Sequence, residues 1–165
     1  MRIIRCNAPL PRGQDYGDVE VGTLSKGQTL ANVEDYDVFE PVNLRYSDQD
    51  AMGHVNNVAY AAFFEAGRMG LFTHLLEGHG DLKFNFVLAN VNIDYLREMH
   101  FPGTVQVGGR LLRVGGRSIT TGFGAFIDGV CYATSTSINV FFDPTTRQSS
   151  DMPETLKADL LRRLR

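Results

Sequence analysis

The feature that most constrains the fold of this chain is a run of three alternating stretches in residues 104–142. Their alternate positions hold mainly apolar, aromatic and β-branched residues, as in strands with one face on a core. Two dipeptides that favour two-residue hairpin turns, Gly115-Gly116 and Asp128-Gly129, separate the stretches. The pattern therefore predicts antiparallel strands over 104–114, 117–127 and 130–142.

A single long helix is predicted before these strands, over residues 57–77. Its apolar positions recur at the i, i+3, i+4, i+7 spacing of one helix face, and they are Tyr60, Phe63, Phe64, Gly67, Leu71 and Leu75. Met69 and Phe72 add apolar area beside this stripe, so most of the helix is expected to be buried. Gly67 and Gly70 each cost such a helix about 1 kcal/mol relative to Ala, which indicates close approach to a neighbouring backbone.

Two further strands and a second helix complete the expected elements. The strands are predicted over 38–46 and 87–96, and the helix over 152–164, with Asp151 as its N-cap and Glu154 completing a capping box. A long helix lying across the concave face of a curved antiparallel sheet gives these elements one core, so the fold class is α+β.

The order of elements also divides the chain. We expect an N-terminal arm over 1–37, with room for a short strand at 19–24, a folded domain over 38–150, and a C-terminal helix within 151–165 that packs on the same domain. No internal repeat is evident.

The composition is that of an ordinary globular domain. Of 165 residues, 43% are hydrophobic and 21% charged, with a net charge of −3, which favours neither nucleic acid nor a membrane surface. No apolar run approaches the length that spans a bilayer, and a secretory signal is not expected. Cys6 and Cys131 match no metal or redox spacing, so we expect free thiols in a reducing cytoplasm.

The richest chemical motif lies in residues 48–60, between the first strand and the long helix. It holds two carboxylates, an imidazole, three amides and a phenol within thirteen residues. A strand-to-helix junction offers free backbone N–H groups that can hold an oxyanion, and a carboxylate there can accept a proton. If this chain catalyses a reaction, the motif is where we expect the catalytic groups.

This motif, Asp-x-Asp-x-x-Gly-His-Val-Asn-Asn-x-x-Tyr, and the order of elements resemble the hotdog-fold acyl-CoA thioesterases, and most closely their hydroxybenzoyl-CoA thioesterase-like branch. Further matches lie at 64–68 in the helix, at 93–96 and 101–104, and at 113–118 around the central hairpin. The resemblance covers about residues 38–150. It implies the hotdog fold and an enzyme that hydrolyses thioesters.

By this resemblance, Asp50 aligns with the catalytic carboxylate. It would act as a general base toward water or as a nucleophile toward the thioester, and the alternative is that it only caps a turn. His54 would orient Asp50, bind substrate or simply pack. Asn57 would contact substrate or cap the helix, and Tyr60 is a core residue whose hydroxyl is placed to reach the site.

Three basic or hydroxyl residues near the Gly115-Gly116 turn, Arg113, Arg117 and Ser118, are candidate contacts for the phosphates of coenzyme A. The alternative is a solvated hairpin tip. Arg110 belongs to the same basic group, and no acidic residue occurs between 104 and 127.

Other polar residues are expected to be structural. Asp48 would accept backbone N–H bonds and shape the turn, and Asn56 would cap the helix or contact substrate. Glu65 ranks below Asp50 as a catalytic base and would otherwise pair with Arg68. His74, His79 and His100 are scattered, so no metal site is expected.

The predicted reaction is hydrolysis of an acyl-CoA thioester to free acid and coenzyme A, with no cofactor. The resemblance implies a site shared between subunits, hence a homodimer or homotetramer. The alternatives are a non-catalytic hotdog module that binds acyl-CoA and a thioesterase for acyl groups on an acyl carrier protein. A hotdog hydratase ranks last.

Overall fold

The computed structural model describes residues 29–36 and 38–164. The strands are β1 (Val38–Asn43), β2 (Phe86–Tyr95), β3 (Thr104–Val114), β4 (Ser118–Ile127), β5 (Val130–Asp143) and β6 (Gln148–Ser149). The helices are α1 (Asn57–Leu75) and α2 (Glu154–Arg162), with short 3-10 helices η1 (Val33–Asp35), η2 (Tyr46–Asp48) and η3 (Gly80–Asn85). The strand predicted at 19–24 and the thiol of Cys6 lie outside the described residues.

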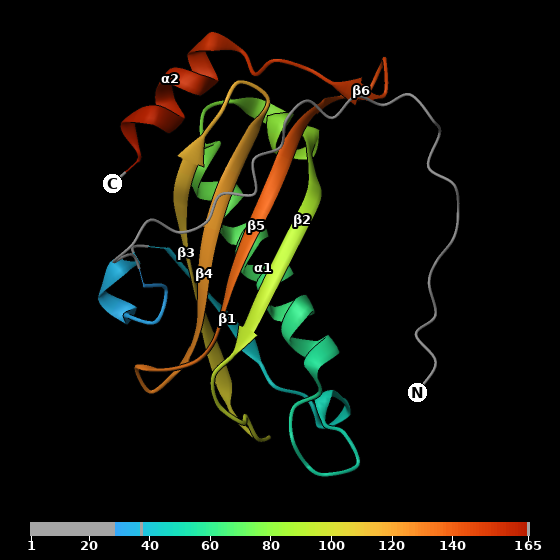
Figure 1. Ribbon diagram of the computed structural model, residues 1–165, viewed down its shortest axis with the longest axis vertical. Coiled ribbons are helices and arrows are strands. Elements are labelled where there is room, and N and C mark those ends of the chain that lie inside the picture. The colour runs from blue at the N-terminus through green and yellow to red at the C-terminus, as the bar shows by residue number, and fades with distance from the viewer. Residues whose placement is uncertain (1–28, 37, 165) are drawn as a thin grey trace.

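Five strands form one antiparallel sheet in the order β1-β3-β4-β5-β2, and β6 pairs with β5 off this path. The sheet curves around α1, which runs along its concave face, while α2 lies at one end (Figure 1). This is the α+β hotdog architecture that the sequence predicts. In the part of the chain that the structure describes, no helix is both long and apolar enough to cross a membrane.

The apolar stripe predicted on α1 faces the sheet. All six predicted positions are buried, and the side chains among them pack in one core cluster with β3 and β4 residues that include Val105, Val107 and Phe123. Phe72 is buried as expected, but Met69 is 42% exposed because it lies off the stripe. One continuous core between helix and sheet therefore holds the fold together.

The two glycines of α1 allow close packing, although their neighbours are side chains and not backbone. A Cβ atom on Gly67 would collide with the Val107 side chain of β3, and one on Gly70 would lie 2.7 Å from an Oε2 atom of Glu40 in β1. The expected approach to a backbone is therefore wrong in detail. Gly67 instead sets the distance between α1 and the sheet.

The two predicted hairpins are present. Asp128 and Gly129 both adopt positive φ, 49° and 76°, as a two-residue primed turn requires. In the other hairpin, the Gly115 N–H donates to the Ser118 carbonyl at 2.8 Å. That turn is therefore centred on 116–117, one residue later than predicted.

The end of the expected N-terminal arm covers the sheet face opposite α1. Leu30 and Tyr36 are buried against Phe126 and Cys131, and the Tyr36 hydroxyl donates to the Leu30 carbonyl at 2.8 Å. Burial raises the pKa of the Cys131 thiol, which keeps this free cysteine protonated. Residues 29–36 thus form part of the folded unit.

The helix α2 closes one end of the core through Leu156 and Leu160, both fully buried. Its N-cap is Pro153, which has no capping side chain, so the predicted capping box of Asp151 and Glu154 is wrong. The Asp151 carboxylate instead accepts a hydrogen bond from Arg117 Nε at 2.8 Å. Asp151 therefore forms an ion pair with the β3–β4 hairpin and does not cap α2.

The strand β2 differs from the others because it lies at the edge of the sheet and is largely exposed. Val87, Val91 and Tyr95 keep 48%, 43% and 51% of their surface accessible. One side of β2 pairs with β5, and no described strand of the chain pairs with its other side. Apolar residues on an unpaired edge favour association with another strand.

Candidate active site

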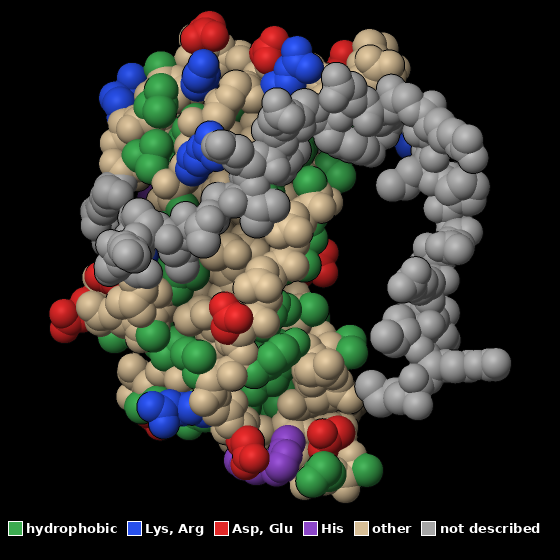
Figure 2. All heavy atoms as spheres, viewed as in Figure 1, with side chains coloured by type: hydrophobic (Ala, Val, Ile, Leu, Met, Phe, Trp, Pro, Cys, Tyr) green, Lys and Arg blue, Asp and Glu red, His purple; other side chains and the backbone are tan. Residues whose placement is uncertain are grey.

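A cavity of about 440 Å³ opens at the end of the molecule where α1 begins. Its lining comes from two segments far apart in sequence, the turn leading into α1 and the end of β2 with the residues after it: Asp50, His54, Val55, Asn56, Asn57, Tyr60, Tyr95, Leu96, Arg97 and Glu98. Figure 2 shows histidine and acidic side chains together at this end of the molecule. A volume of this size suits a small-molecule ligand.

Asp50 lies in the turn at the mouth of this cavity. Its Oδ1 atom accepts backbone N–H bonds from Met52 at 2.8 Å and from His54 at 3.2 Å, and its own N–H donates to the His54 carbonyl at 2.8 Å. Among the described residues, no hydrogen bond engages Oδ2. Asp50 therefore caps the turn with one oxygen and leaves the other available at an exposed position on the cavity.

The neighbouring Asp48 has the structural role expected for it. Its side chain is buried, and Oδ2 accepts the Arg45 N–H at 2.8 Å. Asn56 caps α1, because its Oδ1 accepts the Val58 N–H at 2.9 Å. The Asn56 N–H in turn donates to the Asp48 carbonyl at 2.7 Å. These bonds fix the turn that carries Asp50.

Two tyrosines form the apolar wall of the cavity. The rings of Tyr60 and Tyr95 meet edge to face at 5.1 Å. The Tyr60 hydroxyl donates to the Arg97 carbonyl at 3.4 Å, and the Tyr95 hydroxyl donates to the Asn57 carbonyl at 3.3 Å. Burial, and then the neighbouring Tyr95, raise the pKa of Tyr60, so its phenol remains a neutral hydrogen-bond donor.

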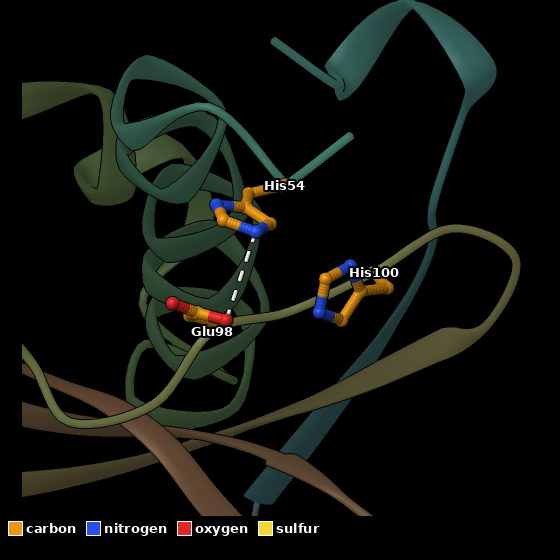
Figure 3. Close-up of side chains that lie close together, drawn as sticks. All are labelled: His54, Glu98 and His100. Carbon is orange, nitrogen blue, oxygen red and sulfur yellow. Dashed lines mark ion pairs between the residues drawn. The ribbon is translucent and has the colours of Figure 1, made fainter. Parts of the chain in front are cut away.

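His54 lies beside two residues that the motif did not indicate, Glu98 and His100 (Figure 3). His54 Nε2 is 3.6 Å from Glu98 Oε2, and the two imidazole rings are 5.1 Å apart. In the sequence, the segment Glu98-Met99-His100 could have indicated this group. Met99 is fully buried, so an extended segment turns its two neighbours to the opposite side.

The hairpin residues Arg113, Arg117 and Ser118 do not line this cavity. They lie near the C-terminal end of α1, whereas Asp50 precedes its N-terminal end (Figure 1). A helix of 19 residues separates the two regions by roughly 28 Å. Arg117 is paired with Asp151, and Arg110 with Asp35 at 3.6 Å. One chain therefore does not bring its arginine hairpin to Asp50.

Glu65 lies on α1 outside the cavity and is exposed. Burial lowers the pKa of the Arg68 guanidinium one turn later, and the Glu65 carboxylate opposes that shift. The two side chains therefore interact through their charges on the surface of α1, and Glu65 is not among the residues that line the cavity with Asp50.

Comparison with known proteins shows which family this chain matches. The thioesterase-like superfamily matches residues 44–160. A predicted thioesterase from Bacillus stearothermophilus has a similar structure, with a TM-score of 0.69 and 25% identity, and the match covers 77% of this chain and 96% of that one. A thioesterase from Thermus thermophilus, solved in complex with coenzyme A and Zn, gives a TM-score of 0.66 at 26% identity, with 77% and 94% covered.

A curated relative agrees over a shorter region. The Bacillus subtilis (strain 168) protein YsmA is 29% identical over 85 residues, which is 52% of this chain and 58% of YsmA. The match therefore spans less than two thirds of the length of that relative.

Proposed function

Because the chain belongs to the thioesterase-like superfamily, we propose that it is an acyl-CoA thioesterase, which hydrolyses a thioester to free acid and coenzyme A. The observation that carries the proposal is the position of Asp50. It lines the cavity, and its Oδ2 atom takes no part in the hydrogen bonds that shape the turn. The similar Thermus thermophilus thioesterase was solved with coenzyme A bound, which supports the substrate class.

The proposed chemistry requires a carboxylate held in a fixed direction. The Met52 and His54 N–H groups hold Oδ1, so Oδ2 can accept the proton of a water that attacks the thioester carbonyl. Alternatively, Oδ2 attacks the carbonyl carbon directly, the C–S bond breaks and releases the coenzyme A thiolate, and water then hydrolyses the resulting mixed anhydride to the free acid. In the first of these two roles, as a general base toward water, a carboxylate contributes about a hundredfold to ten-thousandfold in rate. His54, Asn57 and Tyr60 are proposed to contact the substrate from the cavity wall.

The proposal is tested by thiol release from a panel of aromatic, short and long acyl-CoA thioesters. Asp50→Asn keeps an Oδ1 acceptor for the turn, so the variant is expected to fold normally by circular dichroism while kcat falls by about a hundredfold or more. Asp128→Asn makes the same chemical change in an exposed hairpin turn that also suits Asn, and it should retain full activity. Wild-type turnover in Asp50→Asn would remove Asp50 from the mechanism.

We also propose that the site is completed by a second copy, paired along β2. In an antiparallel pair of β2 strands, the start of one strand lies beside the end of the other. The cavity lies at the end of β2, and η3 immediately precedes its start. Such pairing brings the η3–β2 junction of the partner to the cavity, where its backbone N–H groups are placed to hold the oxyanion. One such donor is typically worth about 3 kcal/mol.

The second copy is tested by light scattering after size exclusion. Val91→Arg places a charge on the β2 edge and is expected to yield monomers with little activity. Val130→Arg is the matched control, because Val91 and Val130 are both 43% exposed but Val130 is the first residue of β5, next to the β4–β5 turn and not on β2. A dimer that survives Val91→Arg would exclude this interface. The predicted coenzyme A contacts of Arg113, Arg117 and Ser118 stay a prediction, and in this geometry they require the hairpin of another copy.

The two rival functions give different results when an acyl carrier protein thioester is added to the panel. A non-catalytic module would bind acyl-CoA saturably and release no thiol. A thioesterase for carrier-borne acyl groups would hydrolyse the acyl carrier protein thioester faster than the coenzyme A thioester with the same acyl chain. Asp50 faces a cavity, and this position favours catalysis over binding alone.

A further inference from the structure

We propose that His54, Glu98 and His100 form a binding site for a divalent transition-metal ion, with Zn²⁺ the best match. The three side chains come from two segments, the turn before α1 and the segment between β2 and β3, and they converge on one point (Figure 3). One potential ligand atom from each residue lies within 4.8 Å of the other two. Among the described residues, these are the only three His, Cys, Asp or Glu side chains gathered in this way.

A backbone hydrogen bond joins the two segments that carry the proposed metal ligands. The Val55 N–H donates to the Met99 carbonyl at 2.8 Å, so the residue after His54 is bonded to the residue between Glu98 and His100. The Met99 side chain is fully buried and Val55 is 6% exposed. Both ligand-bearing segments are therefore anchored to the core next to the proposed site, as a preorganised site requires.

One imidazole is already oriented for metal binding. His100 Nδ1 lies 3.1 Å from the Gly53 carbonyl oxygen. A carbonyl oxygen only accepts hydrogen bonds, so this contact requires a proton on Nδ1, and the neutral ring then carries its lone pair on Nε2. Metal-binding histidines commonly donate their second ring N–H to a carbonyl or carboxylate in this manner.

The ligand set indicates the metal. Two imidazole nitrogens and one carboxylate oxygen suit Zn²⁺ and other first-row transition metals better than Mg²⁺ or Ca²⁺, which prefer oxygen ligands. Ligands of a tetrahedral zinc ion lie about 3.3 Å apart, so the three side chains need to close by a small distance. The Glu98 side chain is 69% exposed and is free to make this rotation.

The site differs from a simple His–Glu ion pair because a second imidazole faces the same point. Three protein ligands leave the fourth tetrahedral position open, as in catalytic zinc sites. His54 and Glu98 also line the cavity with Asp50, so the bound ion lies at its rim. Metal binding itself does not depend on thioester hydrolysis.

The test is isothermal titration of ZnCl₂ into the full chain after removal of metal with a chelator. We expect one Zn²⁺ per chain with micromolar or tighter affinity, and no heat with MgCl₂. His100→Ala and Glu98→Gln change exposed side chains, so both variants should fold normally and bind Zn²⁺ at least about a hundredfold more weakly. His74→Ala, at the other end of α1, is the matched control and should bind as the wild type does.

A spectroscopic measurement locates the ion. In protein labelled with ¹⁵N-histidine, Zn²⁺ should shift the Nε2 resonances of His54 and His100 and leave those of His74 unchanged. No binding to the wild type, or wild-type affinity in both His100→Ala and Glu98→Gln, would overturn the proposal. Because thiol release is a separate assay, loss of the zinc site leaves the thioesterase proposal standing, and an inactive protein that still binds Zn²⁺ leaves the metal site standing.

Discussion

The two ends of α1 each carry two histidines and a carboxylate, but the structure uses them differently. At the C-terminal end, His79 Nε2 lies 2.6 Å from Asp159 of α2 and His74 contacts Arg163. At the N-terminal end, His54 and His100 face the exposed Glu98 beside an open cavity.

The difference arises from what covers each end. The helix α2 packs Leu156 and Leu160 into the core at the C-terminal end of α1 and brings Asp159 to His79. Within the described residues, the second α-helix, α2, does not reach the N-terminal end of α1, and Val58 there is 72% exposed. The same residue types therefore fasten the fold at one end and remain available to a ligand at the other.

The largest expected loss of stability comes from a substitution in α2, which covers the C-terminal end of α1. Leu160→Ala removes a fully buried side chain of α2 and should lower the free energy of unfolding by about 2–5 kcal/mol. Leu161→Ala is the matched control, because Leu161 is 48% exposed, and it should change stability by less than about 0.5 kcal/mol. Urea unfolding measures both. Equal effects would show that α2 does not close the core.

The second-largest expected change in stability concerns the middle of α1. Close packing there sets the distance between the helix and the sheet. Gly67→Ala forces Val107 to move and should cost about 1–3 kcal/mol. Gly70→Ala crowds the flexible end of Glu40, whose Oε2 atom is 2.7 Å from the added Cβ, and makes an ordinary contact with the Glu40 Cβ at 3.4 Å. The better helix propensity of Ala offsets this crowding by about 1 kcal/mol. Thermal unfolding should therefore give Gly70→Ala a higher midpoint temperature than Gly67→Ala. The reverse order would contradict the described packing.

A smaller effect compares the histidines directly. His79→Gln loses the short contact with Asp159 at a side chain that is only 13% exposed, and should cost about 1 kcal/mol. His100→Gln changes an exposed side chain and should leave metal-free stability within about 0.5 kcal/mol. Urea unfolding in the presence of a chelator measures both. A greater loss from His100→Gln would mean that the open end also has a structural role.

The smallest effect is a titration at the hairpin near the covered end. The hydrogen bond and charge of Arg117 hold the pKa of Asp151 below its usual 3.8. A lowered pKa stabilises the fold above the usual value, and this contribution is lost as the pH falls through the pKa of the folded state. Arg117→Ala should raise the Asp151 pKa, as followed by NMR.

Asp143 provides the internal reference for that titration. Its pKa is also lowered, mainly by the backbone N–H of Thr145, and Arg117→Ala should leave it unchanged. A shift of both carboxyls would indicate a general change of the fold and not the loss of one ion pair.

The elements of this fold could be predicted because their signals are local. Alternation over 104–142, positive φ at Asp128-Gly129 and the stripe from Tyr60 to Leu75 depend on residues within a few positions of one another. The turn that carries Asp50 was also local, and so was the cap at Asn56. Along these segments, side-chain type and backbone geometry point to the same answer.

Tertiary structure alone decided which residues from distant segments meet. It paired Asp151 with Arg117 instead of the backbone of α2, placed the arginine hairpin at the far end of α1 from Asp50, and brought Glu98 and His100 to His54. The physical reason is that such contacts depend on how the helix and sheet pack across tens of residues, and no periodicity along the chain encodes them. The sequence by itself determined the two α-helices, the five strands of the main sheet and the turn that carries Asp50, while packing determined what surrounds that turn.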